Sequence, residues 1–68
     1  MVTKKQAQEF YYRLCEAYNG DGNKTCQGIV GIPHIADMMN IPTETATEFC
    51  HAMVEYNITE RQGGGYVI

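Results

Sequence analysis

The sequence predicts a small α+β domain in which three helices are followed by a C-terminal β-hairpin. Apolar side chains recur every three or four residues within 3–19 and again within 43–56, which is the spacing of one helical face. Strand-favouring residues stand on both sides of a glycine run at 63–65, which indicates a hairpin. With 68 residues, the chain is expected to form a single domain, residues 1–68, with little stability to spare.

The first helix is expected from Thr3 to Asn19. Thr3 suits the N-cap position because its hydroxyl can accept a hydrogen bond from a free N–H of the first turn. Asn19 and Gly20 both tolerate the left-handed conformation in which many helices end, so the helix is predicted to stop there. Its apolar face consists of Ala7, Phe10, Tyr11, Leu14, Cys15 and Tyr18.

The middle of the chain is predicted to hold a loop, a short strand and a short helix. Residues 20–31 are rich in Gly, Asn, Asp and Thr, which favours a loop, and residues 26–30 favour a short strand at its end. Pro33 predicts the first turn of the second helix, because a proline there loses no hydrogen bond. Asn40 is expected to end this helix.

The third helix and the hairpin complete the predicted fold. Thr43 is the candidate cap of the third helix, whose apolar stripe runs to about Tyr56. Residues 58–60 and 66–68 are expected to be the two strands of the hairpin, joined by a glycine-rich turn. Because an isolated hairpin is only marginally stable, it is expected to rest on the helices or to pair with the strand at 26–30.

Residues 35–49 match a helix-turn-helix at the positions where that motif is constrained. Ala36 is small at the point where the two helices would cross closely. Asn40 stands where the turn needs a left-handed residue, and Asn is the best substitute for Gly there. The apolar positions that pack the second motif helix onto the first are Ile41, Ala46 and Phe49. The same register turns five side chains outward: Thr43, Glu44, Thr47, Glu48 and His51.

Together with the hairpin, this segment resembles the bacterial winged helix-turn-helix transcription regulators, and especially the branch with a Gly-Gly-Tyr wing. The resemblance is carried by Ile41-Pro42 before the recognition helix, Asn57-Ile58 after it, and Gly64-Gly65-Tyr66 in the wing. It covers residues 29–68, and the first helix is consistent with it. It implies a winged-helix fold and sequence-specific binding of double-stranded DNA.

The resemblance also implies which residues would bind. It places the recognition helix, about 43–56, in the major groove and the wing, 58–68, on the backbone. Arg61 is independently suited to a phosphate or a narrow groove, and Lys4, Lys5 and Arg13 would add positive charge if the first helix presents them to the same side. The implied DNA-binding residues are Thr43, Glu44, Thr47, Glu48 and His51 on the helix, with Arg61 and Gln62 at the wing tip.

The charge of the chain favours a second function. The formal net charge is −3, and the third helix carries Glu44, Glu48 and Glu55 without any Lys or Arg. Such a row of acids repels phosphate. The alternative function is therefore a winged-helix protein-interaction module that docks a basic partner on this acidic face. A homodimer through the first helix or the last strand is also left open, because a domain of this size gains stability from association.

Other function classes find no support in the sequence. No general acid and base stand with a nucleophile, so no enzyme, catalytic residue or cofactor is expected. His34 and Asp37 lack the paired spacing of metal ligands, so no metal is expected. The three cysteines are an odd number and show no paired spacing, which is typical of a reducing compartment. No apolar run is long enough to span a membrane. A cytoplasmic protein is expected.

Overall fold

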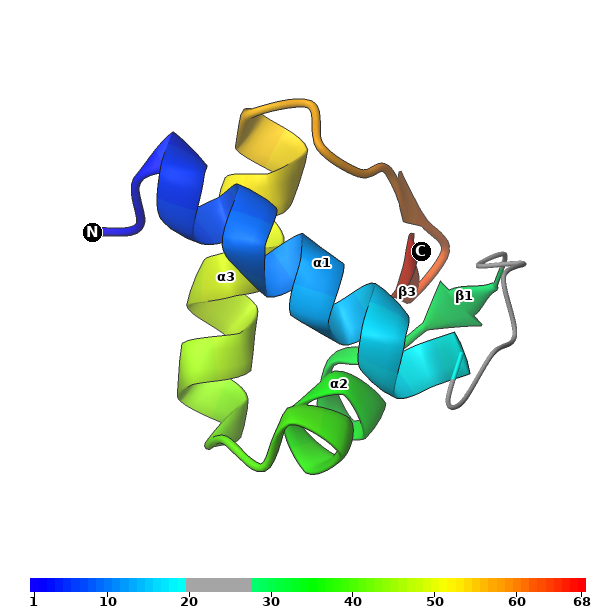
Figure 1. Cartoon of the computed structure of the whole chain (residues 1–68). Helices are drawn as coiled ribbons and strands as arrows, with labels where there is room; N and C mark the ends of the chain where they lie inside the picture. The colour runs from blue at the N-terminus through cyan, green and yellow to red at the C-terminus, as the bar shows by residue number, and fades with distance from the viewer. Residues whose placement is uncertain (20–27) are drawn as a thin grey trace.

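The computed structural model describes residues 1–19 and 28–68 (Figure 1). Its elements are α1 (Lys4–Asn19), β1 (Ile29–Val30), α2 (Ile32–Met39), α3 (Thr43–Glu55), β2 (Arg61–Gln62) and β3 (Gly65–Val67). Figure 1 shows α1 lying across α2 and α3, with the strands to one side of the helices. Three helices and a small antiparallel sheet confirm the predicted α+β class and the layout of a winged helix.

The start of α1 is held by a reciprocal pair of hydrogen bonds. The backbone N–H of Gln6 donates to the Thr3 hydroxyl at 3.2 Å, and the N–H of Thr3 donates to the Gln6 side-chain oxygen at 2.9 Å. This capping box satisfies two N–H groups that the first turn leaves free, so the predicted cap at Thr3 is confirmed. The helix ends at Asn19, and Gly20 lies outside the described residues.

The turn between α2 and α3 has the predicted left-handed residue. Asn40 adopts φ 55° and ψ 49°, and the N–H of Ile41 donates to the carbonyl of Ala36 at 3.0 Å, which closes the helix end. The predicted cap at Thr43 is wrong. Pro42 occupies the N-cap position at φ −64° and ψ 151°, without a side-chain cap, because the proline ring already sets the entry angle. Thr43 is the first residue of α3.

The sheet has the order β1-β3-β2, so the last strand of the chain is the central one. Ile29 pairs with Val67 and Arg61 with Tyr66, both antiparallel, which confirms that the hairpin rests on the strand before α2. That strand is described only at Ile29–Val30; the rest of its predicted span is Cys26 and Gln27, which lie outside the described residues, and Gly28, which is not in the strand.

The first strand of the hairpin lies later than predicted, at Arg61–Gln62 instead of 58–60. The reason is the end of α3. Asn57 takes a left-handed φ of 59°, and the N–H groups of Ile58 and Thr59 donate to the carbonyl of Met53 at 2.8 and 3.3 Å. These backbone donors complete the helix terminus, so Ile58 and Thr59 do not pair as a regular strand. The pairing begins at Glu60, whose carbonyl accepts a hydrogen bond from the N–H of Val67 at 2.9 Å. The Thr59 hydroxyl still donates to the carbonyl of Val67.

The core lies where the three helices meet the inner face of the sheet. Its largest fully buried side chains are Leu14, Ile35, Met53 and Cys50. Burial raises the pKa of the Cys50 thiol to about 11, which suits a small core residue and not a nucleophile. Tyr66 is buried because β3 is the central strand. In the described ranges, no helix has the length and apolar character to cross a bilayer.

Candidate nucleic-acid interface

The side of α3 that faces away from the core carries most of the predicted site. Ala46, Cys50 and Met53 are buried on the inner side of the helix. The helical repeat therefore turns the intervening positions to the surface. Four of the five side chains that the sequence places outward are exposed: Thr43, Glu44, Glu48 and His51.

Thr47 is the exception among the five. Its side chain is half-buried, and its hydroxyl donates to the carbonyl of Thr43 one turn earlier at 2.8 Å. A Thr hydroxyl on a helix commonly donates a hydrogen bond to the carbonyl four residues earlier. Thr47 therefore contributes less to the exposed surface than the sequence predicts, because its donor is engaged within α3.

The wing presents Arg61 and Gln62 from a paired strand and not from its tip. Both are exposed, but both belong to β2, which pairs with β3 at Tyr66 and Gly65. The turn is made by Gly63, at φ 59°, and Gly64. The predicted tip position is wrong for this reason: the ladder extends up to Gln62. Pairing to the central strand holds the backbone from which the Arg61 guanidinium projects.

Charge is distributed unevenly over the described surface. Glu44, Glu48 and Glu55 are exposed on α3, which has no Lys or Arg. Lys4 and Arg13 of α1 lie apart: Lys4 lines a cleft with Tyr56 at the C-terminal end of α3, and Arg13 lines a different cleft near the helix-turn-helix. The exposed face of α3 is therefore acidic, and Arg61 is the cation carried by the wing.

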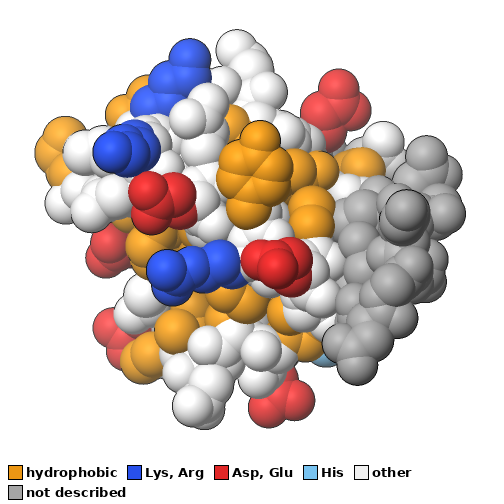
Figure 2. Space-filling model, viewed as in Figure 1, with side chains coloured by type: hydrophobic (Ala, Val, Ile, Leu, Met, Phe, Trp, Pro, Cys, Tyr) orange, Lys and Arg blue, Asp and Glu red, His pale blue; other side chains and the backbone are white. Residues whose placement is uncertain are grey.

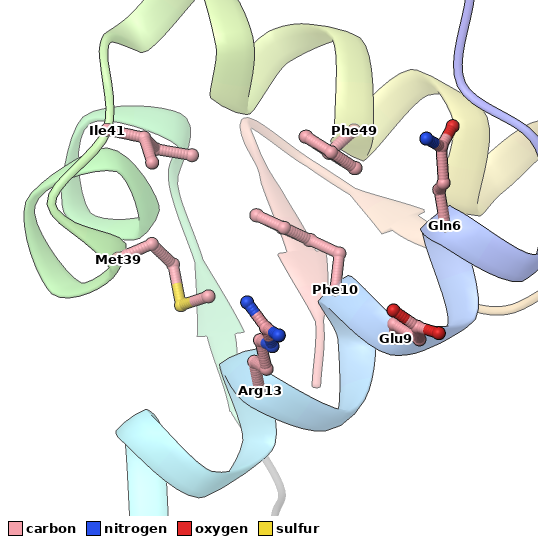
Figure 3. Close-up of a pocket in the computed structure, with 7 residues that line it drawn as sticks. All are labelled: Gln6, Glu9, Phe10, Arg13, Met39, Ile41 and Phe49. Carbon is pink, nitrogen blue, oxygen red and sulfur yellow. The ribbon is translucent and has the colours of Figure 1, made fainter.

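The cleft beside Arg13 shows how α3 is held against α1 (Figure 3). It has a volume of about 250 Å³, and the rings of Phe10 and Phe49 stack inside it with centroids 4.4 Å apart and planes 8° from parallel. Met39 and Ile41 line it from the side of α2 and the turn. The sequence assigns Phe49 to packing between the two motif helices; it misses the contact with α1, because helical spacing does not identify which neighbour a side chain meets.

No metal centre is found within residues 1–19 and 28–68, where no three His, Cys, Asp or Glu side chains gather as ligands. His34 and Asp37 are both exposed on α2. No protein-family model, curated protein or solved structure matches the chain. The candidate interface therefore rests on the geometry of the chain itself, which consists of one exposed helix face and one exposed wing strand.

Proposed function

We propose that this protein is a sequence-specific double-stranded DNA-binding module, acting as a transcription regulator or accessory factor in the cytoplasm. The recognition helix α3 enters the major groove, and the wing lies on the adjacent backbone. One observation carries the proposal. The exposed face of α3 follows a turn fixed at Asn40, and the exposed Arg61 stands on a strand paired to the core, so both project from one rigid frame. Such preorganised elements are what groove recognition requires.

The chemistry of this face sets the expected character of binding. Glu44 and Glu48 can accept from cytosine N4 and so contribute to base choice, but they add no affinity for phosphate. Affinity must come from Arg61 and from the first-turn N–H groups of α3, which have no side-chain cap and can meet a phosphate. With so few phosphate contacts, we expect weak binding that depends only modestly on salt concentration.

Arg61→Ala is expected to weaken binding to every duplex and to reduce the slope of log K against log salt by about one unit, because one phosphate contact is lost. The measurement is fluorescence anisotropy with a random duplex pool, titrated at low and at physiological salt. Arg61→Lys keeps the charge and should keep the slope, and Gln62→Ala should leave it unchanged. An Arg61→Ala protein with the wild-type slope would contradict the placement of the wing on the backbone.

A second candidate function is supported by the row of exposed acids on α3. In this case Glu44, Glu48 and Glu55 dock on a basic protein surface, and opposite charges across the interface guide association. The fold and the exposed face are the same in both candidates. What differs is the sign of the charge that the face attracts.

Glu48→Gln separates the two candidates, because it removes one charge at nearly constant shape. If α3 binds DNA, this substitution should tighten binding to random duplexes at low salt by about 2- to 5-fold, since a repulsion worth roughly 0.5–1 kcal/mol is removed. If α3 docks a basic protein, the same substitution should weaken binding to a Lys-rich probe peptide by a similar factor. Glu16→Gln, at an exposed acid on α1 and outside both α3 and the wing, is the control and should change neither.

A further inference from the structure

The outer face of α1 carries a regular row of alternating charges. Ala7, Phe10 and Leu14 point into the core, and the opposite side of the helix is exposed. Along that side lie four exposed charges at intervals of four, four and three residues: Lys5, Glu9, Arg13 and Glu16. Tyr12 stands beside them with 71% of its surface exposed. Figure 2 shows positive and negative side chains interspersed around apolar ones on the side of the molecule where α1 lies in Figure 1.

We infer that a second copy of this chain docks on this face, with the two α1 helices antiparallel about a two-fold axis. The order of charges along the row is positive, negative, positive, negative. In an antiparallel pair, Lys5 of each copy lies opposite Glu16 of the other, and Glu9 lies opposite Arg13, so all four positions are complementary. A parallel pair would place like charges opposite each other at every position, which is destabilising. The order of charges in the row therefore favours a second copy of the chain as the partner, with its α1 antiparallel.

A single register satisfies all of these pairings. The pair of Lys5 with Glu16 and the pair of Glu9 with Arg13 are both centred at about Tyr11 on the helix. A helical repeat of 3.6 residues places Glu9 and Arg13 on one flank of the row, and Gln8 and Tyr12 on the other. A two-fold axis that relates two antiparallel helices places each flank of one helix against the same flank of the other. Tyr12 of one copy then faces Gln8 of the other, and the midpoint of this pair along the helix lies within one residue of Tyr11.

The flank that holds Tyr12 also has room for an incoming side chain. A cleft of about 420 Å³ runs beside Gln8, between α1 and the end of α3, and Tyr56 forms part of its wall. In the antiparallel register, the cleft of each copy receives the phenol ring of Tyr12 from the other. Exposed tyrosines of this kind are enriched at interfaces, since a rigid ring buries a large area for a small loss of entropy.

Within the part of the chain that the structure describes, the charges of the row remain available to pair across such an interface. Residues four apart on a helix can pair with each other, but in the described residues no ion pair joins the members of this row. A pair of helices of this length buries a small area, at the low end of specific interfaces. The dimer should therefore form in a concentration-dependent way and weaken as salt screens the charges.

The test is sedimentation equilibrium of the whole chain over a range of concentrations at low salt. Glu9→Lys places a lysine opposite Arg13 at two symmetric positions and should raise the dimer dissociation constant at least about tenfold. Combining Glu9→Lys with Arg13→Glu exchanges the charges and should restore dimerisation to within a few-fold of wild type. Glu60→Lys makes the same change in net charge away from α1 and should have no effect.

Two further measurements keep the result unambiguous. Tyr12→Ala leaves every charge in place and should also weaken the dimer, and circular dichroism at low concentration should show that each variant keeps the wild-type helical signal. A wild-type chain that stays monomeric into the millimolar range, or a charge exchange that fails to restore association, would overturn the inference. Neither result depends on whether α3 binds DNA, because the sedimentation experiment contains no DNA.

Discussion

Leu14→Ala is expected to lose about 2–5 kcal/mol of folding free energy, as large-to-small substitutions at fully buried sites do. Leu14 has no exposed surface and lies on α1 at the centre of the core. A domain of this size rarely has more than about 3–5 kcal/mol of stability. The loss is therefore comparable with the whole, and the variant should be largely unfolded under conditions in which the wild type is folded. Urea and thermal unfolding followed by circular dichroism measure it.

The control for this prediction is made at the same position. Leu14→Met nearly conserves volume and apolar character, so it should cost less than about 1.5 kcal/mol and remain folded. Alanine is the better helix former. A loss of stability in Leu14→Ala that is absent in Leu14→Met therefore reflects the cavity and not helix propensity. An alanine variant with the urea midpoint of the wild type would show that Leu14 is not part of the core.

Gly65→Ala is the second large effect, with an expected loss of about 1–3 kcal/mol from overpacking. Gly65 is the first residue of β3, and a Cβ atom added there would lie 2.6 Å from Cγ2 of Ile29 and 3.1 Å from the carbonyl oxygen of Val30. The Ile29 side chain could rotate away, but the backbone of β1 could not yield without disturbing the sheet. Since Tyr66 and Ile68 belong to the core, the cost should appear in the stability of the whole domain.

The neighbouring glycine provides a matched control. A Cβ added at Gly64 would meet no atom within 4 Å, so Gly64→Ala should be neutral or slightly stabilising through the lower entropy of the unfolded chain. Equal unfolding midpoints for Gly64→Ala and Gly65→Ala would contradict the close approach of β1 and β3. The two variants have the same composition, so a difference between them reports on the packing of the sheet alone.

Much of the fold could be predicted because its signals are local. The stripe of apolar residues in α1, the capping threonine at Thr3 and the left-handed Asn40 each act within one turn of backbone, and each is confirmed. The cap at Thr43 and the strand at 58–60 were mispredicted for the same kind of reason. In each case a local preference was overruled by a neighbour: Pro42 took the cap position, and the end of α3 engaged the residues that would have begun the strand.

The candidate site was predicted more completely on α3 than on the wing. Helical periodicity alone predicts whether a side chain points inward or outward, so four of the five outward positions on α3 could be predicted correctly from the sequence. It does not show that a hydroxyl such as that of Thr47 will bond to its own helix. On the wing, the place of Arg61 depended on how far the pairing with β3 extends, which is a property of two segments together.

The three helices, and the side of each that faces the core, could be predicted from the sequence, because periodicity and backbone conformation are properties of adjacent residues. Tertiary structure alone decided which partner each buried group meets. Three glycines in succession look equivalent in the sequence, yet Gly63 adopts a left-handed φ, Gly64 faces open space without one, and Gly65 lies against β1. Phe49 likewise stacks on Phe10 of α1, and Tyr66 is buried since its strand is central. Contacts between distant segments depend on how all the elements pack at once, which no local pattern encodes.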